Sequence, residues 1–208
     1  MNTEKTFQLV AVVLFLLSFG VSAYVRSRAN RAGAKAGDRI SWRGEGATIM
    51  VGLRVAGLAM WLGLLAYLIN PAWMAWSQAP LPVWLRWVGV LLAAVAVPLL
   101  YWMFYSLGLN VTDTVAIRTE HRLVTHGPYR WIRHPLYSFG ALLFLGFILL
   151  SANWFIAAAA LCGGALLARR TPIEEARLTE QFGEEYRGYM RRTGRFLPRL
   201  TRPETGAP

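Results

Sequence analysis

The sequence is poor in cysteine, in acidic residues and in nucleotide-binding glycine motifs. Its single cysteine, Cys162, lies in an apolar run, which excludes an intramolecular disulfide and a CxxC metal or redox site. The 208 residues contain no GxGxxG and no GxxxxGK[ST] pattern, so neither common phosphate-binding loop is present. No serine lies in a GxSxG context, so the nucleophile of an elbow-type hydrolase is missing as well.

Charge is also absent over four long segments. Residues 7–25, 55–85, 87–112 and 135–168 carry no charged side chain, and a membrane-spanning helix needs about 20 apolar residues. The last segment is long enough for two short spans that turn near residues 151–153. Because backbone groups in hydrocarbon must be satisfied within their own segment, the spans are expected to be helices. We therefore predict an all-α, polytopic membrane protein with about five transmembrane helices and a cytosolic C-terminal helix. The predicted spans are residues 7–25, 48–69, 83–108, 135–151 and 153–170.

Basic residues exceed acidic ones by 22 to 11, and most of them lie in three segments. Residues 26–48 hold one lysine and five arginines, residues 109–134 hold four arginines, and residues 169–208 hold nine. The connectors near 70–82 and 151–153 hold neither Lys nor Arg. With five alternating spans every basic segment falls on one side, so the positive-inside rule predicts an outside N-terminus and a cytoplasmic C-terminus. Topology explains this charge without a nucleic-acid partner. The compact chain is expected in a bacterial inner membrane.

The residues able to do chemistry are concentrated in the second half of the chain. Residues 1–108 form three N-terminal spans, and residues 109–208 contain the polar connector 109–134, a helical hairpin (135–170) and a tail (171–208). All three histidines lie in residues 121–134, and Glu174 and Glu175 directly follow the last span. A polar site is therefore expected at the cytoplasmic membrane surface, between the connector and the tail.

The spacing of the histidines does not favour a metal. His121, His126 and His134 are separated by four and seven residues, unlike the tight pairs of zinc sites, and Gly127-Pro128 breaks any helix between the last two. The aromatic, cationic and acidic groups around them suit a ligand with a cationic centre and an amino-acid moiety. S-adenosylmethionine has this chemistry, although these residues alone do not select it over other ligands.

Two motifs resemble a known family. The run HRLVTHGPYRWIRHPLYSFG (121–140) closely resembles the signature of the isoprenylcysteine carboxyl methyltransferase family, and RRTPIEEARLTEQFGEEYRGYMRRTGRFLP (169–198) resembles its second signature. Both occur in the family's order, separated by a short helical hairpin. The resemblance covers residues 109–198 and implies a membrane methyltransferase that uses S-adenosylmethionine and methylates a membrane-associated or lipophilic acceptor. A carboxylate is the first expectation for the acceptor.

The resemblance also implies roles for individual residues. Arg170 falls on the substrate-side arginine, and Arg170 and Glu174 are the expected catalytic pair. Thr114 matches a further cofactor contact loosely. The implied cofactor contacts are His121, Leu123, Val124, Tyr129, His134, Pro135, Leu136, Tyr137 and Glu174.

Several alternatives stay open at this stage. Glu174 could act with Thr171 as the capping box of a tail helix, Arg170 could extend to the membrane interface, and Arg130 and Arg133 could bind anionic headgroups. The acceptor could instead be a phospholipid amine or a small thiol. The chain could also be an NADPH-dependent membrane reductase of a related fold, or a non-catalytic accessory protein. The sequence does not predict the oligomeric state.

Overall fold

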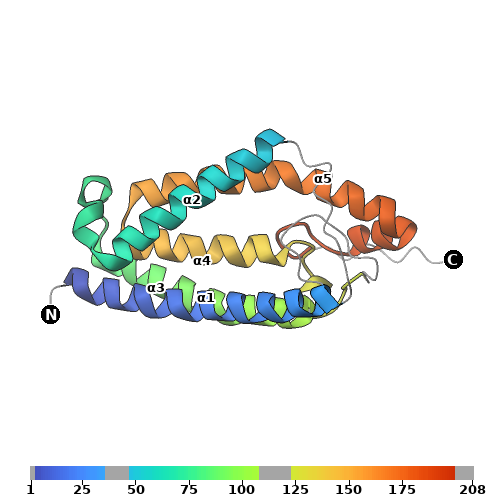
Figure 1. Cartoon of the computed structure of the whole chain (residues 1–208), viewed down its shortest axis with the longest axis horizontal. Coiled ribbons are helices and arrows are strands. Elements are labelled where there is room, and N and C mark those ends of the chain that lie inside the picture. Colours follow the sequence, from blue (N-terminus) through green and yellow to red (C-terminus); the bar gives the residue numbers. More distant parts are fainter. Residues whose placement is uncertain (1–2, 36–46, 108–122, 200–208) are drawn as a thin grey trace.

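The computed structural model describes residues 3–35, 47–107 and 123–199, and these residues are almost entirely helical. In the described ranges the β contacts are two isolated bridges, Gln78 with Asn153 and Ile132 with Gly194. Helices α2 and α5 lie side by side in one layer, α1 and α3 lie in the other, and α4 packs on α3 (Figure 1). The elements are α1 (Thr3–Lys35), α2 (Ala47–Ile69), the 3-10 helix η1 (Pro71–Ser77), α3 (Val83–Leu107), the 3-10 helix η3 (Gly127–Arg130), α4 (Pro135–Ser151) and α5 (Trp154–Arg192).

Membrane-spanning length is reached by four of these helices. The segments Thr3–Val25 and Thr48–Ile69, together with α3 and α5, are long and apolar enough to cross a bilayer. Helix α4 is equally apolar but has only 17 residues. All five predicted spans are therefore present as helices, and the fourth is shorter than a typical span. The chain is a polytopic, integral membrane protein.

Two helices continue beyond their apolar segments. The first span ends at Val25 as predicted, and helix α1 extends beyond it to Lys35. Helix α5 runs through Thr171 without a new start, and the Thr171 hydroxyl donates a hydrogen bond of 2.8 Å to the carbonyl oxygen of Leu167. The hydroxyl is thus used within the helix, and the capping box with Glu174 does not exist. The apolar first half of α5 and its polar second half form one continuous helix as far as Gly183.

The turn between α4 and α5 lies at residues 151–153, as the sequence predicts. Ala152 adopts the left-handed conformation that ends α4, with φ +49°. Asn153 caps α5 because its side-chain oxygen accepts a 3.1 Å hydrogen bond from the Ile156 amide. The Asn153 amide group donates to the Ser77 hydroxyl at 2.8 Å, which ties this turn to η1.

Close backbone contact joins α3 to α4. A Cβ atom added to Gly89 would lie 2.6 Å from the Leu150 amide nitrogen, and one added to Gly146 would lie 2.7 Å from the Ala93 nitrogen. Small residues allow helices in lipid to pack at such short range. This contact fixes α4, and with it the connector that leads into α4, against α3.

An ion pair between the buried Arg86 and the half-buried Glu4 lies at the end of the bundle where α1 begins and α4 ends. Arg86 binds the Glu4 carboxylate through two nitrogens, at 2.7 and 3.0 Å, and donates from Nε to the Leu150 carbonyl oxygen at 2.9 Å. Tyr67 donates to the same carboxylate at 3.0 Å, and the guanidinium lies 4.1 Å from the centre of the Phe7 ring. Residues of α1, α2, α3 and α4 therefore meet at Arg86. The sequence analysis did not predict this cluster.

The polar half of α5 reverses direction at Gly183. Its φ of +55° and ψ of −127° are accessible to glycine and strained for other residues. The residues after Gly183 run back toward the apolar half of α5. As a result, Tyr186 and Tyr189 are buried. This reversal brings the end of the chain back to the connector that precedes α4 (Figure 1).

Candidate functional site

The connector that precedes α4 is held against the end of α3. Gly127, with φ +60°, opens η3, and a Cβ atom there would collide with the Ser106 hydroxyl of α3. Pro128 is buried, and its carbonyl oxygen accepts from the Trp131 and Ile132 amides at 3.1 Å. The tight turn leaves Arg133 and His134 at the N-terminal end of α4.

The segment that follows α5 pairs with this connector from the other side. The Gly194 amide donates to the Trp131 carbonyl oxygen at 3.0 Å, and the Arg133 amide donates back to Gly194 at 2.9 Å. The His134 amide donates to the Arg195 carbonyl oxygen at 3.1 Å, and the Ser138 hydroxyl donates to that of Phe196 at 2.5 Å. Residues 193–198, here called the C-terminal strap, therefore fix the backbone of His134.

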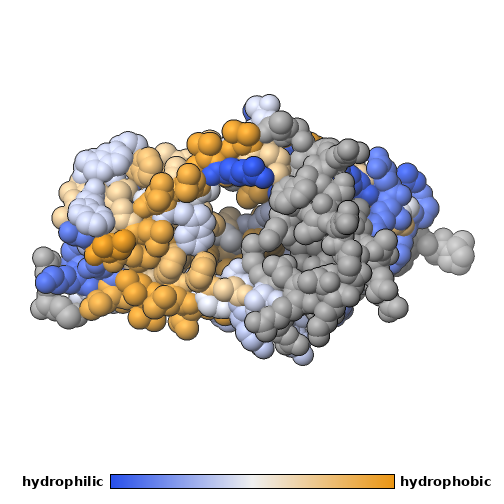
Figure 2. All heavy atoms as spheres, viewed as in Figure 1, coloured by the Kyte–Doolittle hydropathy of each residue, from blue (hydrophilic) through white to orange (hydrophobic). Residues whose placement is uncertain are grey.

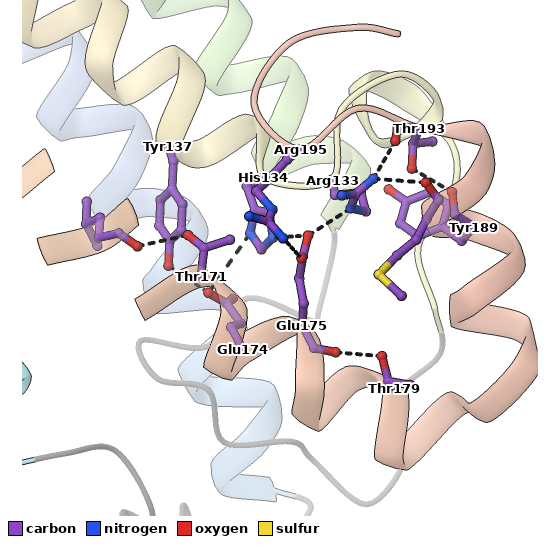
Figure 3. A network of polar contacts seen from close by, with 12 residues as sticks. Arg133, His134, Tyr137, Thr171, Glu174, Glu175, Thr179, Tyr189, Thr193 and Arg195 are labelled. Atoms are coloured by element: carbon purple, nitrogen blue, oxygen red, sulfur yellow. Dashed lines mark hydrogen bonds and ion pairs between the residues drawn. The ribbon is translucent and has the colours of Figure 1, made fainter. Parts of the chain in front are cut away.

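The His134 side chain is buried among aromatic rings and carboxylates. Its ring stacks on Tyr137 with centres 5.4 Å apart and an interplanar angle of 6°, and the Phe196 ring lies 6.0 Å away. Its two nitrogens face different acidic residues of α5: Nδ1 is 4.0 Å from Glu174 and Nε2 is 3.4 Å from Glu175 (Figure 3). Neither contact is a hydrogen bond by geometry, and the buried Nε2 atom has no hydrogen-bond partner among the described residues.

Glu174 presents a carboxylate that remains partly accessible. Tyr137 donates its hydroxyl to this carboxylate at 2.8 Å, and the Glu174 side chain is 24% exposed (Figure 3). Tyr129 lies in the same electrostatic environment: burial, Tyr189 and the Glu174 charge raise the pKa of its phenol above the usual range. The Tyr129 backbone is fixed in turn, because the Tyr189 hydroxyl donates to its carbonyl oxygen at 2.7 Å.

Glu175, by contrast, is buried, and both of its carboxylate oxygens accept hydrogen bonds. Arg133 donates to it from Nε at 2.9 Å and Arg195 donates at 2.5 Å (Figure 3). Glu175 lies beyond the apolar part of α5. Burial acts to raise the pKa of its carboxyl, but contacts from His134, Arg195 and Arg133 outweigh burial and lower that pKa to about 2. Glu175 is therefore the anionic centre that holds the connector, α5 and the C-terminal strap together.

The structure brings together part of the predicted set. His134, Tyr137 and Glu174 are in mutual contact, and Tyr129 interacts electrostatically with Glu174. Arg170 lies one helical turn before Glu174, which places both on the same face of α5. The remaining predicted residues are not placed in this contact set. Pro135 is buried at the start of α4, Leu123 and Val124 are half-buried, Leu136 is exposed, and His121 and Thr114 lie outside the described residues.

The sequence did not reveal which residues hold the site in place. The sequence leaves Arg133 open as a headgroup ligand, but Arg133 donates to Glu175 and to the Met190 and Thr193 carbonyl oxygens, so that alternative is wrong. Glu175 was visible as the second member of a Glu pair, although its position next to Glu174 does not reveal which of them is buried. Phe196 carried no signal beyond its place in the second motif, because its role depends on the reversal at Gly183.

Comparisons with known proteins show which families the chain resembles. The sequence profile of the phospholipid methyltransferase family matches residues 84–185. A probable protein-S-isoprenylcysteine O-methyltransferase of Oryza sativa subsp. indica is 34% identical over 94 residues, covering 44% of this chain and 49% of the relative. The Homo sapiens protein-S-isoprenylcysteine O-methyltransferase is 31% identical over 147 residues, covering 69% of this chain and 50% of the relative. The chain spans about half the length of these curated relatives.

A solved structure extends the similarity to the fold. The eukaryotic intramembrane Ras methyltransferase ICMT superposes with a TM-score of 0.53 at 20% identity, covering 91% of this chain and 67% of that one. Fold and site together define a helical, polytopic membrane protein with a polar site at one end of its bundle. It is similar in sequence and fold to the isoprenylcysteine carboxyl methyltransferases, and the resemblance predicted from its two motifs is confirmed.

Proposed function

We propose that the protein is a membrane methyltransferase that transfers a methyl group from S-adenosylmethionine to a carboxylate on a lipophilic acceptor. The observation that carries this proposal is the contact of His134 and Tyr137 with Glu174, which joins the two motifs shared with the methyltransferase family. The curated relatives named above support the reaction type. Their carboxylate acceptor makes an acidic amphiphile the preferred substrate class.

The described residues fit the proposed cofactor. A partly exposed carboxylate, Glu174, lies beside the aromatic faces of Tyr137 and His134, and aromatic faces and carboxylates both stabilise cations. The buried Nε2 atom of His134 lies 3.4 Å from Glu175, and it makes no hydrogen bond within the part of the chain that the structure describes. When bound, S-adenosylmethionine supplies a methyl group that its sulfonium has already activated.

The residues then act by alignment. Glu174 binds cationic or hydroxyl groups of the cofactor, Tyr137 orients the Glu174 carboxylate, and His134 closes the aromatic wall. Arg170, on the same face of α5 toward the membrane, aligns the anionic acceptor. A carboxylate nucleophile needs no strong general base, which agrees with the absence of a catalytic triad pattern from the sequence. The main contribution to rate is therefore proximity and orientation.

We also propose the orientation of the protein in the membrane. The ends of α1, α2, α3 and α4 nearest the polar half of α5 border the basic segments of the sequence, and the other ends border connectors that lack Lys and Arg. The positive-inside rule then favours a cytoplasmic site, where soluble S-adenosylmethionine is available. In a bacterial host this membrane is the inner one.

Binding and transfer can be tested on the purified protein. Titration calorimetry with S-adenosylhomocysteine should give saturable binding, and E174Q should weaken it at least tenfold because a charge-assisted contact is lost. The control E184Q removes an exposed carboxylate that pairs with Arg187 and should bind like wild type. Binding of NADPH instead of S-adenosylhomocysteine would identify a reductase and overturn the proposal.

A variant of Arg170 tests the binding of the acceptor separately from the binding of the cofactor. R170Q should keep the wild-type affinity for S-adenosylhomocysteine and raise the KM for a carboxylate acceptor, because the guanidinium is assigned to the acceptor alone. R177Q, on the same helix, provides the matched arginine control. An unchanged KM for R170Q would exclude the substrate role of Arg170.

The family profile favours one second candidate, methylation of a phospholipid amine. The two reactions leave products of different stability, since carboxyl methyl esters release methanol in base and N-methyl groups do not. Host membranes should be incubated with methyl-labelled S-adenosylmethionine and the extracted lipids treated with base. Base-labile label supports the carboxylate acceptor, and base-stable label in a lipid supports the amine.

A further inference from the structure

Two adjacent carboxylates of α5 lie at the site, and both nearby guanidiniums bind the same one. Arg133 donates from Nε to Oε1 of Glu175 at 2.9 Å, and Arg195 donates to Oε2 of Glu175 at 2.5 Å. Within the described residues neither arginine forms an ion pair with Glu174, whose side chain is 24% exposed. The negative charge of Glu174 is consequently available to a ligand, and that of Glu175 is offset by two cations.

The two arginines are held in different ways. Arg133 also donates to the carbonyl oxygens of Met190 and Thr193, so three acceptors fix its guanidinium. The Arg195 side chain is 44% exposed, and Glu175 is its one hydrogen-bond and ion-pair partner in the part of the chain that the structure describes. Removal of the Glu175 charge would therefore release Arg195 and leave Arg133 held by the backbone.

A released Arg195 has a second carboxylate within reach. Both carboxylates approach the same imidazole: His134 Nδ1 is 4.0 Å from Glu174, and Nε2 is 3.4 Å from Glu175 (Figure 3). The backbone of Arg195 is fixed beside this ring, because its carbonyl oxygen accepts from the His134 amide at 3.1 Å. The width of one ring thus separates Glu174 from the carboxylate that Arg195 binds. Arginine and carboxylate form strong charge-assisted hydrogen bonds, so the freed guanidinium would turn to Glu174.

We infer that Glu175 is a positioning residue, which keeps Arg195 away from Glu174 and so leaves Glu174 free to bind the cationic part of the methyl donor. The role rests on the proposed function, because Glu174 is assigned to the cofactor there. Glu175 acts through Arg195 and makes no contact with the cofactor itself. The second carboxylate of the Glu-Glu pair is thus a determinant of cofactor affinity, in addition to its part in holding the C-terminal strap.

A double-mutant cycle of Glu175 and Arg195 tests the role. When Arg195 is present, E175Q should weaken the binding of S-adenosylhomocysteine about tenfold, because a guanidinium then competes with the ligand's amino group for Glu174. In the R195Q background the competitor is missing, so E175Q should change the affinity by less than about twofold. Calorimetry measures the four proteins. E184Q/R187Q, which removes an exposed Glu–Arg pair, is the matched control and should bind like wild type.

A purely structural role predicts a different pattern. If Glu175 only held the strap in place, E175Q would weaken binding in the R195Q background as well, and this result would overturn the inference. Equal affinity of E175Q and wild type would overturn it too. Thermal unfolding checks that each variant is folded. If E175Q alone does not fold, the comparison of E175Q/R195Q with R195Q still decides, because the double variant has lost both the carboxylate and the cation that it would leave unpaired.

Carboxyl labelling separates this role from the proposed function. Figure 2 shows hydrophilic residues gathered over the polar half of α5, where a water-soluble reagent has access. A carbodiimide with glycinamide labels accessible carboxyl groups, and mass spectrometry locates the label without any cofactor. Labelling of Glu174 should fall in E175Q and return in E175Q/R195Q, with the exposed Glu184 as internal reference.

The two failures are then distinguishable. If wild type does not bind S-adenosylhomocysteine, the proposed function fails, and the labelling still shows whether Glu175 keeps Arg195 from Glu174. Unchanged labelling of Glu174 in E175Q would overturn the inference, even if wild type binds the cofactor analogue.

Discussion

The Tyr137 hydroxyl lies 2.8 Å from the Glu174 carboxylate, and this hydrogen bond joins the first turn of α4 to the polar half of α5. The two residues are 37 positions apart in the sequence and belong to different motifs. Their contact orients the Glu174 carboxylate. The proposed cofactor site thus depends on the packing of two helices as well as on residue identity.

Y137F tests this contact. Loss of the hydroxyl should weaken S-adenosylhomocysteine binding about tenfold, since a hydrogen bond to a charged group contributes roughly 1.5–3 kcal/mol. Calorimetry measures the affinity, and Y105F, at an exposed tyrosine of α3, is the matched control. Wild-type affinity in Y137F would show that Glu174 does not need this donor.

The Arg86 cluster should contribute strongly to stability. E4Q leaves a buried guanidinium without its counterion, so the free energy of unfolding should fall by about 3 kcal/mol. The double variant E4Q/R86M removes both charges and should recover much of the loss. Unfolding by SDS in mixed micelles measures the three proteins, with E184Q as the control at an exposed pair. If the double variant is less stable than E4Q, the cluster stabilises through its packing, not through its charge pair.

Gly89 should tolerate no side chain. G89A should destabilise the protein by about 1–3 kcal/mol, because its methyl group would displace the α4 backbone at Leu150. G164A is the control, since a Cβ atom there meets nothing within 4 Å. The same SDS titration applies, and equal stability of the two variants would contradict the close contact of α3 with α4.

The low pKa of Glu175 predicts that the protein loses stability in acid. Its pKa is about 2 in the folded protein and 4.5 in the reference state, so the unfolded chain binds the proton first as the pH falls. The stabilisation, on the order of 3 kcal/mol, is complete above pH 4.5 and is lost toward pH 2. Thermal unfolding across this window should decline more steeply for wild type than for E175Q, and E180Q should follow wild type. Parallel curves for wild type and E175Q would contradict the assignment.

The sequence predicted the helices better than their ends. The uncharged runs predicted the five apolar helices and the turn at residues 151–153. The length of an apolar run and the capping preference of Asn153 can both be read from the local sequence. The continuation of α5 through Thr171 was missed, since Thr-Pro followed by Glu-Glu also reads as a helix start. The resemblance supplied His134, Tyr137 and Glu174. The Glu175 contacts with Arg133 and Arg195 could not be predicted, because they require the chain reversal at Gly183.

Continuity of α5 has a consequence for the proposed methyl transfer. Twenty residues separate Trp154 from Glu174, a distance of about 30 Å along an unbroken helix, which equals the thickness of the hydrocarbon layer. Helix α5 therefore spans the hydrocarbon layer, with Trp154 at one membrane surface and Glu174 at the other. If the proposed methyl transfer takes place at Glu174, an acceptor is selected first by the depth of its carboxylate in the bilayer and only then by its shape.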